Sequence, residues 1–246
     1  MRPRARHLQS GAHGNEEFAA LKTADLYRLM AWLSPAYPVG AFSYSSGIEW
    51  AVEAGDIRDA ETLRRWLAVM IGQGSGFIDA VFFVHAHRAA AAGDAAALRA
   101  VAELAAAFVS SRERLLETTA QGRAFVEATR AAWPCPALAR LEAAWRGAIA
   151  LPVAVGVACA GHAIDCGMAV HAFVHALAAN WTSAGVRLVP LGQTDGQRVL
   201  AGLEEDAAAA AMRALKTPLQ DAGACALRAD IAGMRHETQY TRLFRS

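Results

Sequence analysis

The strongest candidate for chemistry in this sequence is a group of metal-binding residue types near its centre. Cys159, His162 and Cys166 are spaced three and four residues apart, so on a continuous helix they share one face. Thiolate sulfur and imidazole nitrogen are good ligands for zinc and nickel. Because only three ligands share this face and Gly161 and Gly167 can bend the helix, ordinary buried side chains are the simpler interpretation. A transient nickel contact is the alternative that remains open.

Three other patterns could suggest chemistry, but each has a simpler structural explanation. His85 and His87 lie two residues apart, which places them on different faces of a helix. Glu113 and Glu117 have a spacing seen in di-metal helical bundles, yet no Glu-x-x-His motif accompanies them, so a solvated helix face is the simpler interpretation. The glycine cluster at residues 72–76 lacks the lysine of a phosphate-binding loop and follows no predicted strand. We therefore predict no catalytic site and no resident cofactor.

The least helical stretch is residues 34–49, which interrupts Ala-rich helical sequence. Pro35 and Pro38 remove two backbone donors and push their preceding residues away from helical dihedral angles. The sequence thus predicts that one helix ends near Leu33 and that the next begins near Gly47.

The same stretch combines a predicted helix start with aromatic side chains. Ser46 and Glu49 have the spacing of a capping box, in which each side chain accepts from a backbone N–H. Tyr37, Phe42 and Tyr44 accompany several serine hydroxyls. This composition suits packing of an ordinary helix connection, and it also suits contact with a protein partner.

The C-terminal stretch interleaves basic and aromatic residues, namely Arg235, His236, Tyr240, Arg242, Phe244 and Arg245. Such a pattern can grip nucleic acid. The segment is short, however, and the formal net charge of the chain is only +1, so docking on a protein is favoured. A tail without a core of its own is expected to order only when it is docked.

Helical periodicity through the rest of the chain predicts an all-α, single-domain helical bundle. With 246 residues, 54% of them hydrophobic, the chain can bury a sizeable core. Residues 1–22 are rich in Arg, Gly and His and are predicted to be a disordered extension, which leaves 23–246 as the helical domain. Four dispersed cysteines form no CxxC pair, which fits reduced thiols in a cytosolic protein.

Several helix boundaries can be predicted from local signals. Asp59 is expected to cap a helix that ends in the glycine cluster. Residues 182–190 are expected to form a connection, because they are β-branched and contain glycine. Residues 197–216 are expected to form one helix, and 224–234 the last one.

Two long stretches, residues 147–164 and 166–186, carry no formal charge when histidine is taken as neutral. Each approaches the length that spans a membrane. They consist mostly of Ala, Gly and Val, and Pro152, His162 and His171 interrupt them with groups that are costly in lipid. We therefore predict two central helices buried on all sides of a soluble bundle.

Three blocks of the sequence together resemble the UreF family of urease accessory proteins. They are SPAYPVGAFSYSSGIE at residues 34–49, NWTSAGVRLVPLGQTDGQ at residues 180–197 and MRHETQYTRLFRS at residues 234–246. Three blocks in the same order are a far more specific signal than one short motif. The first block departs from the family pattern at Tyr37, Ser46 and Ile48, and the departure at Tyr37 affects the expected surface shape there.

The resemblance implies an all-helical, homodimeric, cytoplasmic protein that is not itself an enzyme. Proteins of this family act with UreD (also called UreH) and the GTPase UreG to deliver nickel to apo-urease, so nickel would be cargo and GTP hydrolysis would belong to UreG. Carried onto matching positions, the resemblance implies a UreG-facing surface at Pro38, Gly40, Phe42, Tyr44 and Glu49. It likewise implies UreD docking, or ordering of that surface, by Arg235, Tyr240, Arg242 and Phe244. Neither nucleic acid nor a membrane is an expected partner.

Overall fold

The computed structural model describes residues 22–246, and regular structure in that range is entirely helical. The prediction of an all-α fold is therefore confirmed. The predicted extension at residues 1–22 lies, except for its last residue, outside the described residues. The helices in chain order are α1 (Thr23–Trp32), α2 (Ile48–Glu53), α3 (Ala60–Gln73), α4 (Ser75–Ala92), α5 (Ala95–Ala107), α6 (Arg112–Ala132), α7 (Pro136–Ala144), α8 (Leu151–Gly161), α9 (Cys166–Leu188), α10 (Gln193–Ala201), α11 (Glu204–Ala214) and α12 (Leu227–His236), with 3-10 turns η1 (Ala41–Ser43) and η2 (Leu219–Asp221).

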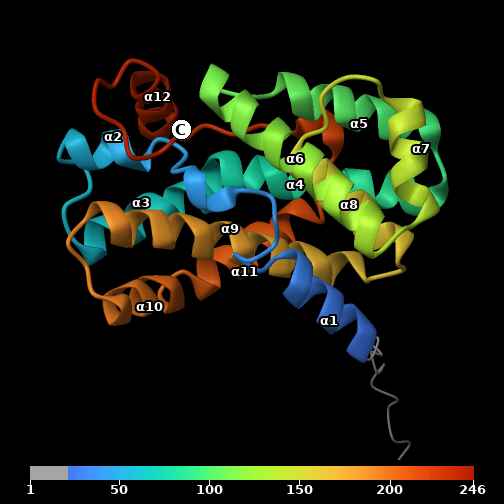
Figure 1. Ribbon diagram of the computed structural model, residues 1–246, viewed down its shortest axis with the longest axis horizontal. Helices are drawn as coiled ribbons and strands as arrows, with labels where there is room; N and C mark the ends of the chain where they lie inside the picture. The colour runs from blue at the N-terminus through green and yellow to red at the C-terminus, as the bar shows by residue number, and fades with distance from the viewer. Residues whose placement is uncertain (1–21) are drawn as a thin grey trace, which may run out of the picture.

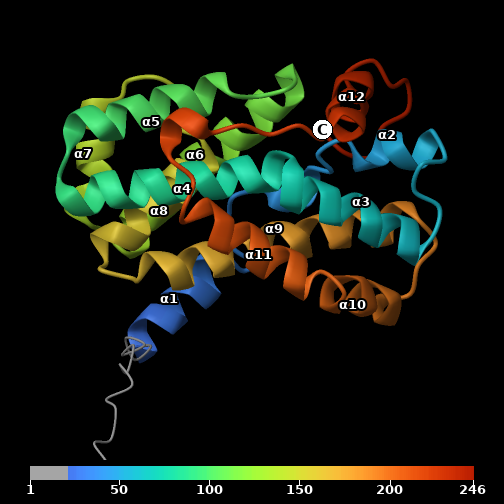
Figure 2. The ribbon, with the colours of Figure 1, turned by 180° about the vertical axis from the view of Figure 1, so that it is seen from behind.

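Helix α4 runs through the middle of the bundle, where Figure 2 shows it between α5 and α11. Its most extensive packing is against α8. A Cβ atom built on Gly156 of α8 would lie only 2.5 Å from the carbonyl oxygen of Phe83. The small residues of α8 thus allow the two helices to approach closely, because a side chain here would push them apart.

The prediction of two central helices is only half right. Helix α8 is buried along nearly its whole length, but α9 is buried mainly on one side, and α4 occupies the second central position. Polar residues obscured the role of α4 in the sequence. Two of them are buried with partners: Asp79 is bonded to Arg114, and His87 Nε2 lies 2.8 Å from the carbonyl oxygen of Ile164. Such pairing makes their burial tolerable.

Among the described residues, one stretch is long and apolar enough to cross a membrane by length and composition alone. It is Ala60–Ala92, which contains α3 and α4 rather than the two stretches singled out from the sequence. Within its most apolar window, 72% of the residues are buried inside the protein. A buried core helix of this kind passes the same test, so the stretch is weak evidence for a membrane.

Local signals placed several boundaries correctly. Helix α1 ends at Trp32, and α2 begins at Ile48. Asp59 caps α3 by accepting from Thr62 N at 2.8 Å, and the Thr62 hydroxyl accepts in turn from Asp59 N at 3.1 Å. This reciprocal pair satisfies donors that a helix start leaves free. The helical conformation is interrupted at Gly74, between α3 and α4, as the glycine cluster predicted.

Three boundaries in the C-terminal half were wrong. Helix α9 continues through the expected connection at residues 182–190 as far as Leu188. The predicted helix 197–216 is interrupted at Gly202 and Leu203, which separate α10 from α11. The last helix is α12, which starts three residues later than predicted and ends at His236. For α9 the error reflects tertiary packing, which overrides local preference at a helix end.

Gly185 illustrates why α9 continues. A Cβ atom built there would lie 2.5 Å from Cδ2 of Leu63 on α3. The missing side chain therefore makes room for a leucine from a neighbouring helix, and burial of that leucine offsets the poor helix propensity of glycine. In this position the glycine serves packing rather than a turn.

Candidate partner-docking site

Two segments that lie far apart in the sequence meet where α12 lies beside α2 (Figure 1). We call residues 34–47 the proline segment and residues 237–246 the strap. Arg245 N donates to Ser43 O at 2.8 Å, and Ser45 N donates to Ser246 O at 2.7 Å. The Ser45 hydroxyl also donates to Ser246 O. The strap therefore docks on the proline segment of its own chain.

Glu49 is the acceptor that holds the strap. Its side chain is buried, and its Oε1 atom accepts from Leu243 N at 2.6 Å. Its Oε2 atom accepts from Phe244 N at 2.9 Å and lies 3.0 Å from His236 Nε2. A carboxylate that receives several hydrogen bonds is well compensated for its burial. Glu49 thus acts inside the site rather than on its surface.

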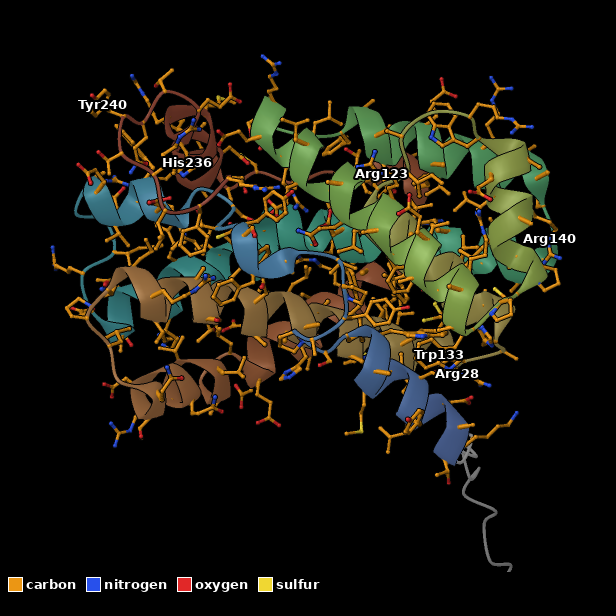
Figure 3. All side chains as sticks on the ribbon, viewed as in Figure 1. Arg28, Arg123, Trp133, Arg140, His236 and Tyr240 are labelled. Atoms are coloured by element: carbon orange, nitrogen blue, oxygen red, sulfur yellow. The ribbon has the colours of Figure 1, made fainter. Side chains whose placement is uncertain are left out.

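His236, the last residue of α12, connects Glu49 to α6. It is completely buried, and its Nδ1 atom lies 2.6 Å from Oε2 of Glu113. The other oxygen of Glu113 accepts from Arg242 NH1 at 2.7 Å. In Figure 3, His236 lies among the side chains of this region, whereas Tyr240 lies at the outer edge of the strap. The result is a chain of alternating acids and bases that joins α2, α12, α6 and the strap.

A second polar network lies beneath the first and is centred on Glu117. Its two carboxylate oxygens both lie 3.1 Å from the Ser46 hydroxyl, and Oε2 accepts from the Ser246 hydroxyl at 2.9 Å. Arg114 NH1 lies 3.2 Å from Oε1 of Glu117 and also pairs with Asp79. Burial raises the pKa of the Asp79 carboxyl, and Arg114 opposes this effect.

The backbone of the proline segment ends in two left-handed residues. Ser46 has φ 52° and Gly47 has φ 81°. The unusual conformation of Ser46 is held by its hydroxyl, which accepts from Trp181 Nε1 at 3.0 Å and faces Glu117. The predicted capping box is therefore wrong: Ser46 points to α6 and α9, and it is the Ser45 hydroxyl that accepts from Glu49 N, at 3.3 Å.

Arg187 of α9 joins the proline segment to the strap through two aromatic rings. Its guanidinium carbon lies 3.6 Å from the ring centroid of Phe42 and 4.3 Å from that of Phe244. Its NH2 group also donates to Phe42 O at 2.9 Å. Partial burial lowers the pKa of Arg187, while the aromatic faces supply compensating attraction for the cation. The Arg187 cation thus has its partners in the proline segment and the strap.

Replacing Arg187 by Met should loosen the strap while keeping most of the packing volume. Loss of two cation–π contacts is expected to cost about 1–2 kcal/mol of strap docking. Limited trypsin digestion should then cleave faster after Arg242 and Arg245 in the variant than in the parent. The matched control is Arg198→Met, since the Arg198 side chain is 74% exposed and pairs with Asp195. Equal cleavage rates in Arg187→Met and in the parent protein would show that the two rings do not depend on this cation.

The nine residues proposed as partner contacts divide into exposed and buried groups. The exposed ones are Pro38, Gly40, Phe42, Arg235, Tyr240 and Arg242, and the buried ones are Tyr44, Glu49 and Phe244. All nine lie in or next to the contact between the proline segment, α12 and the strap. The three buried residues hold the contact between these segments together, and the six exposed residues lie at its surface.

Sequence reasoning missed several residues of this site. The sequence pattern placed His236 in a basic tail, and it placed Glu113 and Glu117 on a solvated helix face. All three are buried or nearly buried in the two networks. One signal in the sequence linked His236 to this site: it lies in the block 234–246, and Glu49 lies in the block 34–49 of the same family resemblance. The departure from the family pattern at Tyr37 was expected to affect the surface shape there, but Tyr37 is buried, and its hydroxyl lies 2.8 Å from the Thr129 hydroxyl. The departure from the family pattern therefore alters the core.

The candidate metal ligands do not share a helix face. Helix α8 ends at Gly161, and Ala163 has φ 56°, so the chain turns between Cys159 and Cys166. Within residues 22–246, no three His, Cys, Asp or Glu side chains are grouped so that they could hold a metal ion. His162 Nε2 lies 3.1 Å from Trp133 O. The geometry gives the nickel-binding alternative no support in the described part of the chain.

The cysteines should differ sharply in reactivity. Burial raises the pKa of the Cys166 thiol to about 11 and raises that of Cys159 further, whereas Cys225 is exposed. At pH ~8 only about one part in a thousand of Cys166 is thiolate, the form that reacts. Iodoacetamide should therefore modify Cys225 first, and modification of Cys166 should accelerate as the pH approaches 11. Peptide mass spectrometry would measure this, and equal rates for Cys166 and Cys225 at pH ~8 would contradict it.

Comparison with known proteins gives a consistent result. The family model described as UreF matches residues 57–204. The chain is 61% identical over 228 residues to the urease accessory protein UreF of Rhodopseudomonas palustris strain BisB5, covering 93% of this chain and 94% of the relative. It is 60% identical over 230 residues to the urease accessory protein UreF of Bradyrhizobium diazoefficiens, covering 94% and 95% of the two chains. Similarity thus extends over nearly the whole sequence.

Proposed function

We propose, from the premise that this chain belongs to the UreF family of urease accessory proteins, that it bridges UreD and the GTPase UreG during nickel delivery to apo-urease. In this proposal the protein is a cytoplasmic homodimer that performs no chemistry itself. Nickel is cargo of the assembled complex, and GTP hydrolysis belongs to UreG.

The observation that carries the proposal is the convergence of the two terminal signatures. Ser43 and Ser45 bond the strap directly, although about two hundred residues separate them from it. Their contact places Phe42, Tyr240 and Leu243 at the surface, with exposed fractions of 63%, 102% and 68%. Exposed aromatic and arginine side chains around a rigid base are typical of protein-binding surfaces.

Buried and exposed residues would have different roles in this function. Glu49 and Phe244 would fix the position of the strap, as their backbone and side-chain contacts indicate. Tyr240 and Arg242 would contact UreD or UreG directly. A change at a buried residue should therefore weaken partner binding indirectly, through loss of strap order, whereas a change at the fully exposed Tyr240 should weaken it without altering the fold.

Assembly with purified UreD and UreG tests the proposal. Tyr240→Ala and Arg242→Ala should each reduce formation of the ternary complex on gel filtration, and the double variant should reduce it most. The expected loss is about tenfold or more in affinity for a true anchor residue. Co-expression with the urease operon should show a parallel fall in the nickel content and activity of urease.

The matched control is Arg140→Ala on α7, an exposed arginine far from the strap in Figure 3. It should leave assembly unchanged. If the double variant at Tyr240 and Arg242 assembled as well as the parent, the proposed surface would be wrong. If deletion of the whole gene left urease activation intact in its own operon, the bridging function itself would be wrong.

A further inference from the structure

His236 has an environment that partner bridging does not explain, because two carboxylates lie within hydrogen-bond distance of its one buried ring. Glu49 Oε2 lies 3.0 Å from Nε2, and Glu113 Oε2 lies 2.6 Å from Nδ1. An ionised carboxylate can only accept, and a neutral imidazole donates from one nitrogen alone. With a neutral ring, one nitrogen lone pair would face a carboxylate oxygen. The docked geometry therefore holds one more proton than a neutral ring between two ionised carboxylates would supply.

The charges around this ring lead to the same conclusion. Glu49 comes from α2 and Glu113 from α6, while Arg242 of the strap occupies the second oxygen of Glu113. An imidazolium makes the group of four neutral in total, and a neutral ring would leave one negative charge uncompensated. Uncompensated buried charge is strongly destabilising.

The other charged groups that residues 22–246 place near this ring do not replace that proton. Arg114 faces the same region from α6 but is already paired with Asp79 and Glu117. Glu237 follows the ring along the chain and accepts from Arg112 N at 2.8 Å. Asp230 of α12 borders the small cavity beside Glu113 and would add further negative charge.

We propose that docking of the strap is coupled to protonation at His236, so that the surface carried by the strap is held at lower pH and released as the pH rises. Release would free the amides of Leu243 and Phe244 from Glu49 and would detach Arg242 from Glu113. Tyr240 and Arg242 would then lose their fixed position. The regulatory consequence rests on the proposed function: urea hydrolysis liberates ammonia, which consumes protons, so active urease would weaken further assembly of its own maturation complex.

Amide exchange on the full chain without partners tests the coupling directly. Protection of the Leu243 and Phe244 amides should be measured by NMR from about pH 6 to about pH 9, which spans the ordinary titration of imidazole. After correction for the intrinsic exchange rate, protection should fall by up to about tenfold per pH unit once the proton is being lost. The Val84 amide in the core helix α4 should show no such fall.

Glu113→Gln is the decisive variant, because it supplies the missing donor. The Gln amide group can donate to Nδ1 of a neutral ring, and its oxygen can still accept from Arg242. Docking in this variant should lose its pH dependence. The matched control is His85→Gln, which alters a histidine bonded to the Thr217 carbonyl and should leave the parent pH dependence intact.

Nitrogen chemical shifts of the His236 ring provide a measurement that requires no variant. Both nitrogens should carry protons while the strap is docked. Flat protection across the pH range in the parent, or unchanged pH dependence in Glu113→Gln, would overturn the inference. If the strap responds to pH as expected but binding of UreD and UreG does not change, the proposed docking function fails while the proton coupling stands.

Discussion

Glu49→Gln should detach the strap and cost about 3 kcal/mol of its docking free energy, since hydrogen bonds to a charged group contribute about 1.5–3 kcal/mol each. One carboxylate accepts from Leu243 N, Phe244 N and His236. Either orientation of the glutamine amide places its NH₂ group against at least one of these donors. Amide exchange at residues 243 and 244 should therefore approach that of an unstructured peptide, while the bundle remains folded.

Glu53→Gln is the matched control, because Glu53 lies one turn further along α2 and is exposed. It should leave strap protection unchanged. Retained protection at Leu243 and Phe244 in Glu49→Gln would show that the serine contacts hold the strap by themselves, and the central role given to Glu49 would be wrong.

Among substitutions that add a single methyl group to the site, Gly47→Ala should lower the free energy of unfolding most. Gly47 has φ 81°, and a Cβ atom there would lie 2.6 Å from the backbone nitrogen of Gly233 and 2.9 Å from its Cα atom. Neither atom belongs to a flexible side chain, so α12 must move away. The left-handed conformation adds about 1–2 kcal/mol and the overpacking about 1–3 kcal/mol. We expect a total loss of about 3 kcal/mol in the free energy of unfolding, measured by urea denaturation.

Gly40→Ala distinguishes the cost of the left-handed backbone conformation from the cost of a steric clash at the added Cβ atom. Gly40 has a similar φ of 73°, but no atom of the described residues lies within 4 Å of a Cβ atom built on it. This variant should lose only the conformational part, about 1 kcal/mol. If Gly40→Ala and Gly47→Ala were equally destabilised, close packing of α12 on the proline segment would not contribute to stability.

The fold could be predicted wherever a local signal sets the backbone. Pro35 and Pro38 ended α1 where expected, and Asp59 started α3, because both effects involve neighbours in sequence. The errors occurred where distant side chains decide. Nothing near Gly185 reveals that Leu63 packs against it, and the centrality of α4 depends on partners for Asp79 and His87. Periodicity identifies a buried face but not the residues that cover it.

Some residues of the candidate site could be named from the sequence, but their arrangement could not be predicted. Family signatures named Glu49 and the strap residues, yet no pattern in the sequence indicates that Glu49 accepts hydrogen bonds from them. Spacing-based reasoning assigned Glu113 and Glu117 to solvent, because four-residue spacing describes one helix face and not its environment. His236 appeared to belong to a basic tail, and its burial between two acids is a property of the tertiary structure alone.

Closure between Ser45 and Ser246 has a consequence for synthesis, because these residues are 201 positions apart. A ribosome makes the proline segment about two hundred residues before the strap, at about 5–20 residues per second. Nascent chains therefore carry an unfinished surface until translation reaches the strap, and long-range closure is entropically slow. Partners that recognise the joined surface would ignore truncated products, so the topology itself would reserve assembly for chains synthesised through the strap.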